Sequence, residues 1–151
     1  MARWRNPDEW RGLVDGSACP ICRSGRPFGV LAETHASWVA SWEHVTCRGY
    51  TCVFARRHVT ELYELDADER VGFFADVAVV ARVVAELFQP VKLNYEIHGN
   101  TIPHLHVNLY PRYRGDPFEG TPVRGGETHA MHSAGDLAAM AQAFAAALAQ
   151  N

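Results

Sequence analysis

A run of alternating polar and apolar residues, His-Leu-His-Val-Asn-Leu-Tyr at positions 104–110, constrains the fold more than any other feature of the chain. Successive side chains of a β-strand point to opposite faces of the sheet, so His104, His106 and Asn108 are expected to share one face. The aliphatic residues between them share the other face, which would pack on a hydrophobic core. The chain is therefore expected to contain a sheet with one covered face and one face that presents two imidazoles and an amide.

This row of imidazoles suits two kinds of chemistry. A neutral imidazole can bind a metal ion, and it can act as a nucleophile when its neighbours hold it in position. A metal site at His104 and His106 that activates a bound water would need a third ligand, and His98 is the obvious donor. The alternating residues alone leave both kinds of chemistry open.

Length, charge and hydropathy exclude several classes of protein. A chain of 151 residues has room for one domain with a hydrophobic core. Its formal net charge of -3 offers no basic face to a nucleic-acid polymer. No apolar run approaches the roughly 18 residues of a membrane span, and the first ten residues lack the apolar segment of a secretory signal. We therefore expect a cytoplasmic protein with reduced cysteines and no nucleic-acid or membrane partner.

Turn residues and hydrophobic periodicity divide the chain into an N-terminal arm, residues 1–18, and a single domain, residues 19–151. The arm is polar and contains a short predicted helix over 7–13. The last two predicted strands form a hairpin that turns across Gly99-Asn100-Thr101. The predicted strands cover residues 30–33, 37–42, 50–55, 91–98 and 102–110.

A long helix is expected after residue 65. Asp66 can cap it, and Glu69 three residues on completes a capping box. Apolar residues then recur at helical spacing until Pro90 ends the run. These apolar residues are expected to lie in the core: Phe73, Phe74, Val77, Val80, Ala81, Val84 and Leu87.

A second helix, rich in alanine, is expected near the end of the sequence, where Ser133 and Asp136 can cap it. Residues 113–132 precede it and are rich in Gly, Pro and His, so we expect a loop in which His129 and His132 are solvated. The order of these elements indicates an α+β fold: an antiparallel β-sheet with two main helices packed on it.

The pair Cys19-x-x-Cys22 indicates either a redox site or a metal site. A redox site of this kind would lie in a βαβ unit, and the predicted elements do not include one. A metal site needs two further ligands. The candidates are Cys47 with Cys52 or a pair of histidines at strand ends, His58 and His104.

Several ordered segments of the sequence together resemble the histidine-triad (HIT) family of nucleotide hydrolases and transferases. The family signature alternates three histidines with apolar residues, and here Asn108 stands in place of the third histidine. The resemblance implies the antiparallel fold described above. The segments are Cys19–Cys22, the strand and basic turn over 49–58, the helix start over 65–69, Lys92–Tyr95 with Gly99-Asn100, and the signature over 104–112.

The resemblance implies roles for particular residues. The family's nucleophile is the middle histidine of the signature, which corresponds to His106, and Asn108 would lie beside the leaving group. Asn94, Asn100 and Thr101 correspond to positions that bind the substrate. The family's ribose carboxylate has no clear counterpart: Glu43 is the candidate, and Trp42 either stacks on a base or packs into the core.

The resemblance also implies a structural zinc ion and a homodimer. Members that carry zinc bind it through residues that correspond to Cys19, Cys22, His58 and His104, which leaves Cys47 and Cys52 as core residues. Four protein ligands leave no open coordination position, so the ion would be structural.

The function that the resemblance implies is cleavage at the α-phosphate of a nucleotide derivative through a nucleotidyl-His106 intermediate. The substrate would be a phosphoramidate, a dinucleoside polyphosphate or a nucleotide sugar. An asparagine at position 108 can donate a hydrogen bond but cannot deliver a proton. The galactose-1-phosphate uridylyltransferases, a distant branch, have glutamine at this place and act as transferases. Hydrolase and nucleotidyltransferase therefore both remain open, and so does a non-catalytic nucleotide-binding module.

Overall fold

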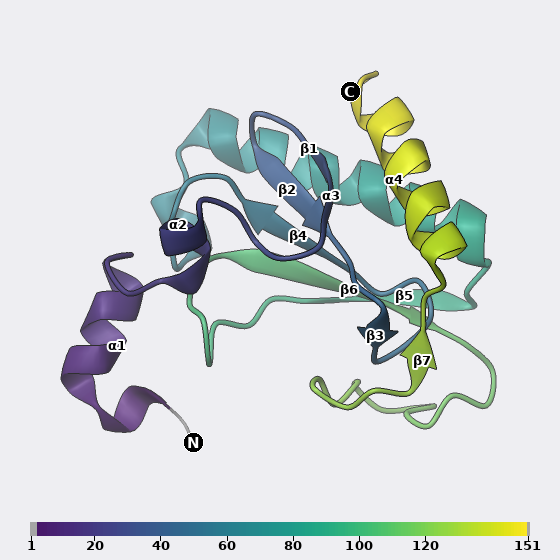
Figure 1. Ribbon diagram of the computed structural model, residues 1–151, viewed down its shortest axis with the longest axis horizontal. Helices are drawn as coiled ribbons and strands as arrows, with labels where there is room; N and C mark the ends of the chain where they lie inside the picture. The colour runs from purple at the N-terminus through teal and green to yellow at the C-terminus, as the bar shows by residue number, and fades with distance from the viewer. Residues whose placement is uncertain (1–2, 151) are drawn as a thin grey trace.

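Five antiparallel strands form the central sheet of the computed structural model, which describes residues 3–150 (Figure 1). The first two residues of the expected arm and the last residue of the expected domain lie outside this range. The strand order is β1-β2-β4-β6-β5, so β5 is an edge strand. The expected α+β class is confirmed. The strands are β1 (Val30–Glu33), β2 (Ser37–Ala40), β4 (Thr51–Ala55), β5 (Lys92–Glu96) and β6 (His106–Arg112).

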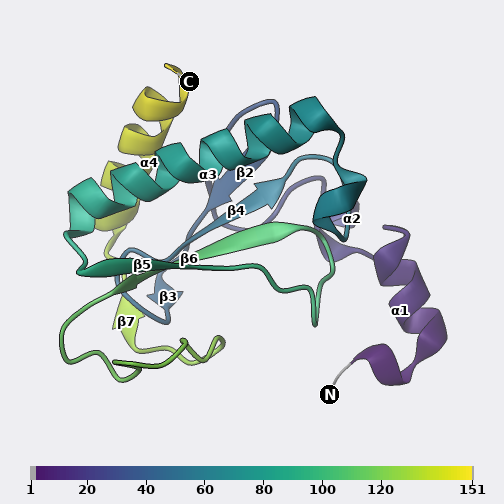
Figure 2. The same cartoon turned by 180° about the vertical axis from the view of Figure 1, so that it is seen from behind.

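Two helices, α3 (Ala67–Phe88) and α4 (Ala134–Leu148), cover one face of this sheet (Figure 2). Both begin with the predicted capping boxes, formed by Asp66 with Glu69 and by Ser133 with Asp136. Within residues 3–150, no helix has the length and apolar character that crossing a bilayer requires.

The core lies between these helices and the sheet. Val107 and Leu109 of β6 are buried there with Phe73 of α3 and Phe144 of α4, so the aliphatic face of the alternating run is the covered one, as predicted. Two residues of α3 predicted to be core, Phe74 and Leu87, are instead 38% and 41% exposed. A helix on a sheet buries one stripe of side chains, and Phe74 lies at the edge of that stripe, whereas Leu87 lies in the last turn of α3. The fully buried side chains include Leu13, Leu105, Leu109, Phe73, Phe144 and Met140.

Several short elements were missed by the sequence patterns because they span too few residues to show a period. The Cys-x-x-Cys segment, to which the sequence patterns assigned no element, lies on a short helix with proline in its first turn and Gly25 in the left-handed conformation at its end. Two strands of two residues pair in a second small sheet, and one lies in the segment expected to be a loop. The remaining elements are η1 (Arg3–Arg5), α1 (Pro7–Val14), α2 (Pro20–Ser24), β3 (His44–Val45), η2 (Leu62–Glu64) and β7 (Ala130–Met131).

The connection between β5 and β6 differs from the predicted tight hairpin. β5 ends at Glu96 and β6 begins only at His106, so residues 97–105 form a longer loop. Before β6 begins, the backbone of Leu105 donates to the carbonyl of Val59 and accepts from the amide of Ala55. The chain therefore pairs with the end of β4 and its extension instead of with β5. Pro103, which has no N–H, also cannot donate to a ladder.

Candidate active site

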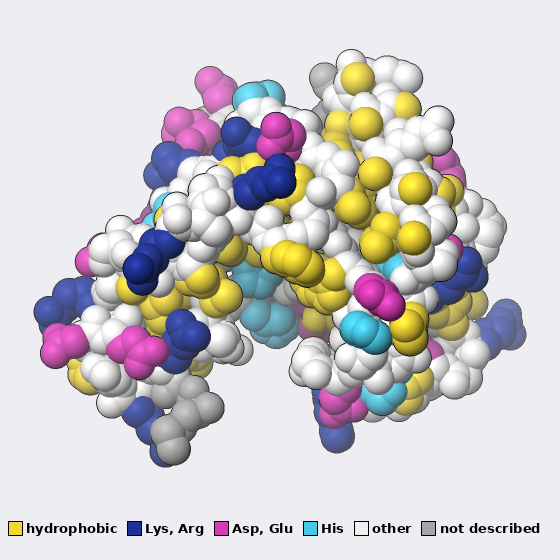
Figure 3. Space-filling view, in the orientation of Figure 1, with side chains coloured by type: hydrophobic (Ala, Val, Ile, Leu, Met, Phe, Trp, Pro, Cys, Tyr) yellow, Lys and Arg dark blue, Asp and Glu magenta, His cyan; other side chains and the backbone are white. Residues whose placement is uncertain are grey.

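A cavity of about 470 Å³ opens on the face of the sheet that α3 and α4 leave uncovered. We call it the His106 cavity. Figure 3 shows a hollow on this side, with histidine side chains visible in its depth. His106 and Asn108 line it from β6, and Asn100 and Thr101 line it from the β5–β6 connection. The fold therefore brings together four of the five residues expected to carry out catalysis and bind the substrate.

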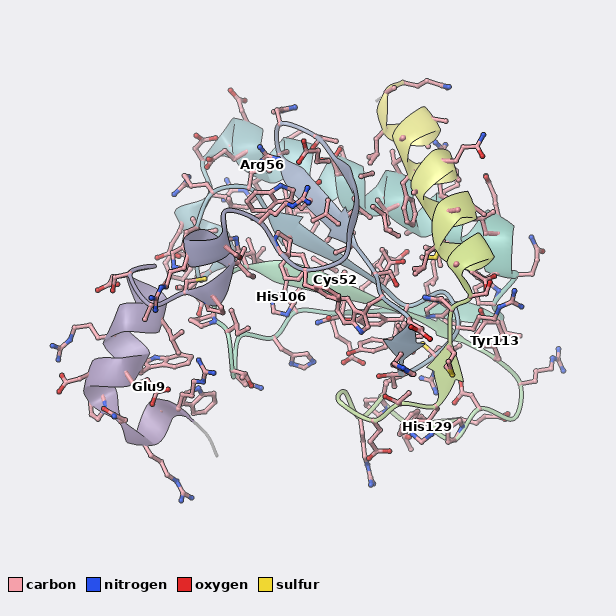
Figure 4. The ribbon with its side chains drawn as sticks, viewed as in Figure 1. Glu9, Cys52, Arg56, His106, Tyr113 and His129 are labelled. Atoms are coloured by element: carbon pink, nitrogen blue, oxygen red, sulfur yellow. The ribbon has the colours of Figure 1, made fainter. Side chains whose placement is uncertain are left out.

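His106 is the first residue of β6 and is labelled in Figure 4. Its Nδ1–H donates to the backbone carbonyl of His104 at 2.7 Å, and because a carbonyl only accepts, the neutral ring keeps its lone pair on Nε2. Phe54, the register partner of His106 on β4, lies against the ring with centroids 5.4 Å apart. Burial lowers the pKa of His106 below its ordinary value, and the hydrogen bond to the His104 carbonyl opposes this effect. The site thus presents a fixed, neutral imidazole.

Asn108 is fixed at both ends of its amide. The hydroxyl of Tyr50 donates to Oδ1 at 2.6 Å, and Nδ2 donates to the backbone carbonyl of Glu96 at 3.3 Å. The Glu96 carbonyl can accept only from the nitrogen, which determines the orientation of the amide. Nothing in the local sequence marked Tyr50 as a site residue, since it is separated from Asn108 by 58 positions.

Asn94, the fifth predicted site residue, lies outside the His106 cavity. It lines a neighbouring cavity of about 800 Å³, where its Oδ1 accepts from Nη1 of Arg112 at 2.8 Å. The strand register explains this: Glu96 is paired with Asn108, whereas Asn94 is paired with Tyr110, one pleat further away. We call the second space the Arg112 cavity.

Arg112 organises the loop that follows β6. Its guanidinium makes two hydrogen bonds to the carboxylate of Asp116, at 2.8 and 2.9 Å, and also donates to the carbonyls of Phe118 and Thr121. This pairing lowers the pKa of Asp116 to about 2. The loop is thereby held beside the two cavities, which share Glu96, His98 and Val123 in their walls.

Next to the start of β6, four side chains converge on one point. The ligand atoms of Cys19, Cys22, His58 and His104 all lie within 4.8 Å of one another, which is the one such group within residues 3–150. Cys22 Sγ lies 3.3 Å from His58 Nδ1 and 3.7 Å from His104 Nδ1, and the two Nδ1 atoms are 3.2 Å apart. This group could hold a metal ion.

The donor set fits a tetrahedral ion. Nε2–H of His104 donates to the carbonyl of Ala55 at 2.8 Å, and Nε2–H of His58 donates to the carbonyl of Val14 at 3.0 Å. Both rings therefore direct an unprotonated Nδ1 at the shared point. Zinc bonds of about 2.0 Å to nitrogen and 2.3 Å to sulfur would place tetrahedral ligands about 3.3–3.8 Å apart, close to the separations observed.

The other metal sets considered from the sequence do not form. Cys47 and Cys52 pack in an apolar cluster with Tyr50 and Tyr110 instead of joining Cys19. No group of three or more ligands among residues 3–150 includes His106, so the water-activating metal site is not supported.

The structure also places four residues whose roles the sequence left open: Trp42, Glu43, His129 and His132. His132, expected to be solvated, is 1% exposed: its Nε2 accepts from the amide of Gly49, and its Nδ1–H donates to the carbonyl of Trp42. The pairing of β3 with β7 carries it into the interior. His129 is exposed, as expected, and pairs with Glu127. Trp42 lines the His106 cavity, whereas the exposed Glu43 does not.

Comparisons with known proteins agree with this geometry. The protein-family model of the HIT domain matches residues 30–115 of this sequence. "Protein hit" of Bacillus subtilis is 29% identical over 107 residues, which cover 66% of this chain and 73% of that protein. The asymmetrical bis(5'-nucleosyl)-tetraphosphatase of Schizosaccharomyces pombe is 32% identical over 80 residues, which cover 50% of this chain but only 44% of the tetraphosphatase.

Solved structures share the fold. A zinc-bound histidine triad family protein from Mycobacterium smegmatis superposes with a TM-score of 0.60 at 22% identity, and the match covers 89% of this chain and 95% of that one. The chain belongs to the HIT domain family.

Proposed function

We propose that this protein is a nucleotide hydrolase or nucleotidyltransferase that cleaves at the α-phosphate of a nucleotide derivative and forms a nucleotidyl-His106 intermediate. The observation that carries the proposal is the free Nε2 of His106 in the His106 cavity, with Nδ1–H tied to the His104 carbonyl. A strand-held imidazole with one free lone pair is a nucleophile whose position is already set, and positioning is the main requirement of phosphoryl-type transfer.

The proposed reaction has two steps. The lone pair of His106 Nε2 forms a bond to the α-phosphorus, while the bond to the leaving oxygen or nitrogen breaks and its electron pair stays with the leaving atom. Water, or a second acceptor, then attacks the phosphorus, gives up a proton to the solvent and releases His106 with its lone pair. Asn100 and Thr101 would donate hydrogen bonds to the phosphate oxygens, and the second N–H of Asn108 would donate to the leaving atom.

The nucleoside portion is proposed to lie in an apolar cavity of about 400 Å³ that adjoins the His106 cavity. Trp42, Phe54 and Ile102 form part of both walls. Flat aromatic bases stack on such side chains with little dependence on their hydrogen-bonding edges. Phosphoramidates, dinucleoside polyphosphates and nucleotide sugars all present the required α-phosphate, and the match to a tetraphosphatase supports the second class.

We further propose that the metal ion is structural zinc, bound by Cys19, Cys22, His58 and His104. The donor chemistry described above supports this, and so does the zinc-bound relative. Bound there, the ion would hold the N-terminal segment against the residue two places before His106. With four protein ligands it would leave no coordination position for the substrate.

Three broader expectations remain part of the proposal. The chain is expected to divide into an arm of residues 1–18 and a domain of residues 19–151. The hydrogen bond between Val14 and His58 connects this arm to the metal group of the domain. A homodimer is supported by β5, which is an edge strand with exposed Tyr95. A cytoplasmic location is expected from the amino-acid sequence.

Steady-state turnover of a panel of nucleotide donors tests the proposed function. His106→Asn should reduce turnover by at least about a thousand-fold, because the nucleophile is lost. The matched control is His129→Asn, an exposed histidine outside the cavity, which should retain wild-type rates. Full turnover by His106→Asn would refute the proposal.

A nucleotide-binding module without turnover is the second candidate, and the presence of Asn108, which cannot deliver a proton, favours it. Equilibrium dialysis with a labelled nucleotide separates the two. Binding by the wild-type protein without any product from the panel would establish the module.

A further inference from the structure

The proposed reaction has an unfilled role. A basic leaving group, such as an alkylamine or an alkoxide, departs readily only if it receives a proton. Asn108 cannot supply one, and its amide is already fixed by Tyr50 and the Glu96 carbonyl. Another side chain in the His106 cavity must therefore act if such leaving groups are to depart.

Besides the nucleophile His106, five side chains that line this cavity carry an ionisable group. The hydroxyl of Tyr50 is committed to Asn108, and burial raises the pKa of Tyr110 to about 12. Cys52 is 1% exposed, and burial raises the pKa of its thiol. The remaining candidates are Glu96 and His98.

Glu96 and His98 form a pair in the cavity wall. Nε2–H of His98 donates to Oε2 of Glu96 at 3.0 Å, with the His98 side chain 53% exposed and the Glu96 side chain 17% exposed. This leaves Nδ1 of His98 free for a ligand. His98 also lines the Arg112 cavity, so it stands where the two spaces meet.

We propose that His98, oriented by the carboxylate of Glu96, is the proton donor to the leaving group in the reaction of His106. This inference rests on the proposed function. Glu96 contacts both Asn108 and His98: its backbone carbonyl accepts from Asn108, and its carboxylate accepts from His98. Asn108 then contributes a hydrogen bond, and His98 contributes the proton.

Bond formation at phosphorus is coupled to proton transfer from His98. His106 Nε2 forms its bond to phosphorus, and the bond from phosphorus to the leaving atom breaks with the electron pair on that atom. The proton on Nδ1 of the His98 imidazolium moves to the leaving atom, which leaves His98 neutral. In the second step, His98 takes a proton from the attacking water as that water forms its bond to phosphorus and His106 is released.

A second histidine–glutamate pair supplies an internal control. Nε2 of His129 lies 2.9 Å from Oε2 of Glu127, with the same spacing of two residues, but this pair does not line the His106 cavity. Figure 4 shows His129 on the loop, well apart from His106. The two pairs share the same contact and differ in position, because His98 lines the His106 cavity and His129 does not. The proposed role of His98 therefore depends on its position in the cavity wall.

The test compares two donors of the same nucleotide in single-turnover experiments that follow the nucleotidyl adduct. One donor is an adenosine phosphoramidate with an alkylamine leaving group, which needs a proton, and the other is p-nitrophenyl AMP, whose phenolate leaves unprotonated. His98→Gln should slow adduct formation by about 100-fold or more with the alkylamine donor. With the p-nitrophenyl donor the rate should stay within about three-fold of wild type, and His129→Gln should match wild type with both.

Equal slowing with both donors, or no slowing with either, would overturn the role of His98. Neither result would affect the proposed function, which fails separately if the wild-type protein forms no adduct with either donor. Glu96→Gln provides a second test of the pair. It should slow the alkylamine donor selectively in the wild-type background and have no further effect in the His98→Gln background, whereas additive losses would contradict the pairing.

Discussion

Tyr50→Phe removes one hydroxyl group and tests how Asn108 is held. Tyr50 and Asn108 are 7% and 6% exposed, and the hydroxyl lies 2.6 Å from Oδ1 of Asn108. Loss of the donor leaves a buried amide oxygen without a partner, which costs about 1–3 kcal/mol. Because the site borders a cavity that water can enter, we expect about 1–2 kcal/mol. In a chain of this size, that corresponds to a fall in Tm of roughly 2–8 °C.

Urea unfolding followed by tryptophan fluorescence measures this loss. The matched control is Tyr113→Phe, because the Tyr113 hydroxyl donates to the carbonyl of Arg48 at 3.0 Å near the surface, and its loss should cost less than about 1 kcal/mol. In an Asn108→Ala background, Tyr50→Phe should cost at least about 0.5 kcal/mol less than it does alone. Equal costs in the two backgrounds would show that the hydroxyl does not act through Asn108.

Two further predictions concern the metal group and the loop after β6. Zinc at 100 times its dissociation constant should stabilise the zinc-free protein by about 2.7 kcal/mol. This gain in stability should be lost in Cys22→Ser and kept in Cys47→Ser. A Tm that does not respond to zinc would contradict the proposed centre. The Arg112 guanidinium holds the pKa of Asp116 at about 2, below its ordinary 3.8, so the stabilisation by this carboxylate is complete above about pH 4 and is lost as the pH falls toward 2. The stability difference between wild type and Asp116→Asn should therefore be about 1–2 kcal/mol smaller at pH 2.5 than at pH 6 in urea titrations, and a difference independent of pH would refute the assignment.

The alternating run at residues 104–110 allowed the face of β6 to be predicted because a strand has a strict period of two. His106, Asn108 and the covered residues Val107 and Leu109 lie on the expected faces. The capping boxes of α3 and α4 were equally accessible, since they depend on residues three positions apart. The four metal-group residues were proposed from a resemblance to a family, and the fold brings them together.

What the sequence could not supply depends on pairings between distant segments. The register of β5 against β6 decides that Glu96, and not Asn94, lies beside Asn108. The pairing of β3 with β7 buries His132, but each strand has only two residues and so shows no period. His98 gave no signal as a proton donor, because its placement depends on the longer loop between β5 and β6.

The central claim is that His106 becomes covalently nucleotidylated. It is tested most directly by the intact-protein mass after brief incubation with activated nucleotides, with His106→Ala beside the wild type. We predict a mass increase of one nucleoside monophosphate on the wild-type protein alone, formed fastest with the donor class that is the substrate. The same increase on His106→Ala, or product released by that variant at the wild-type rate, would contradict the assignment of His106 as the nucleophile.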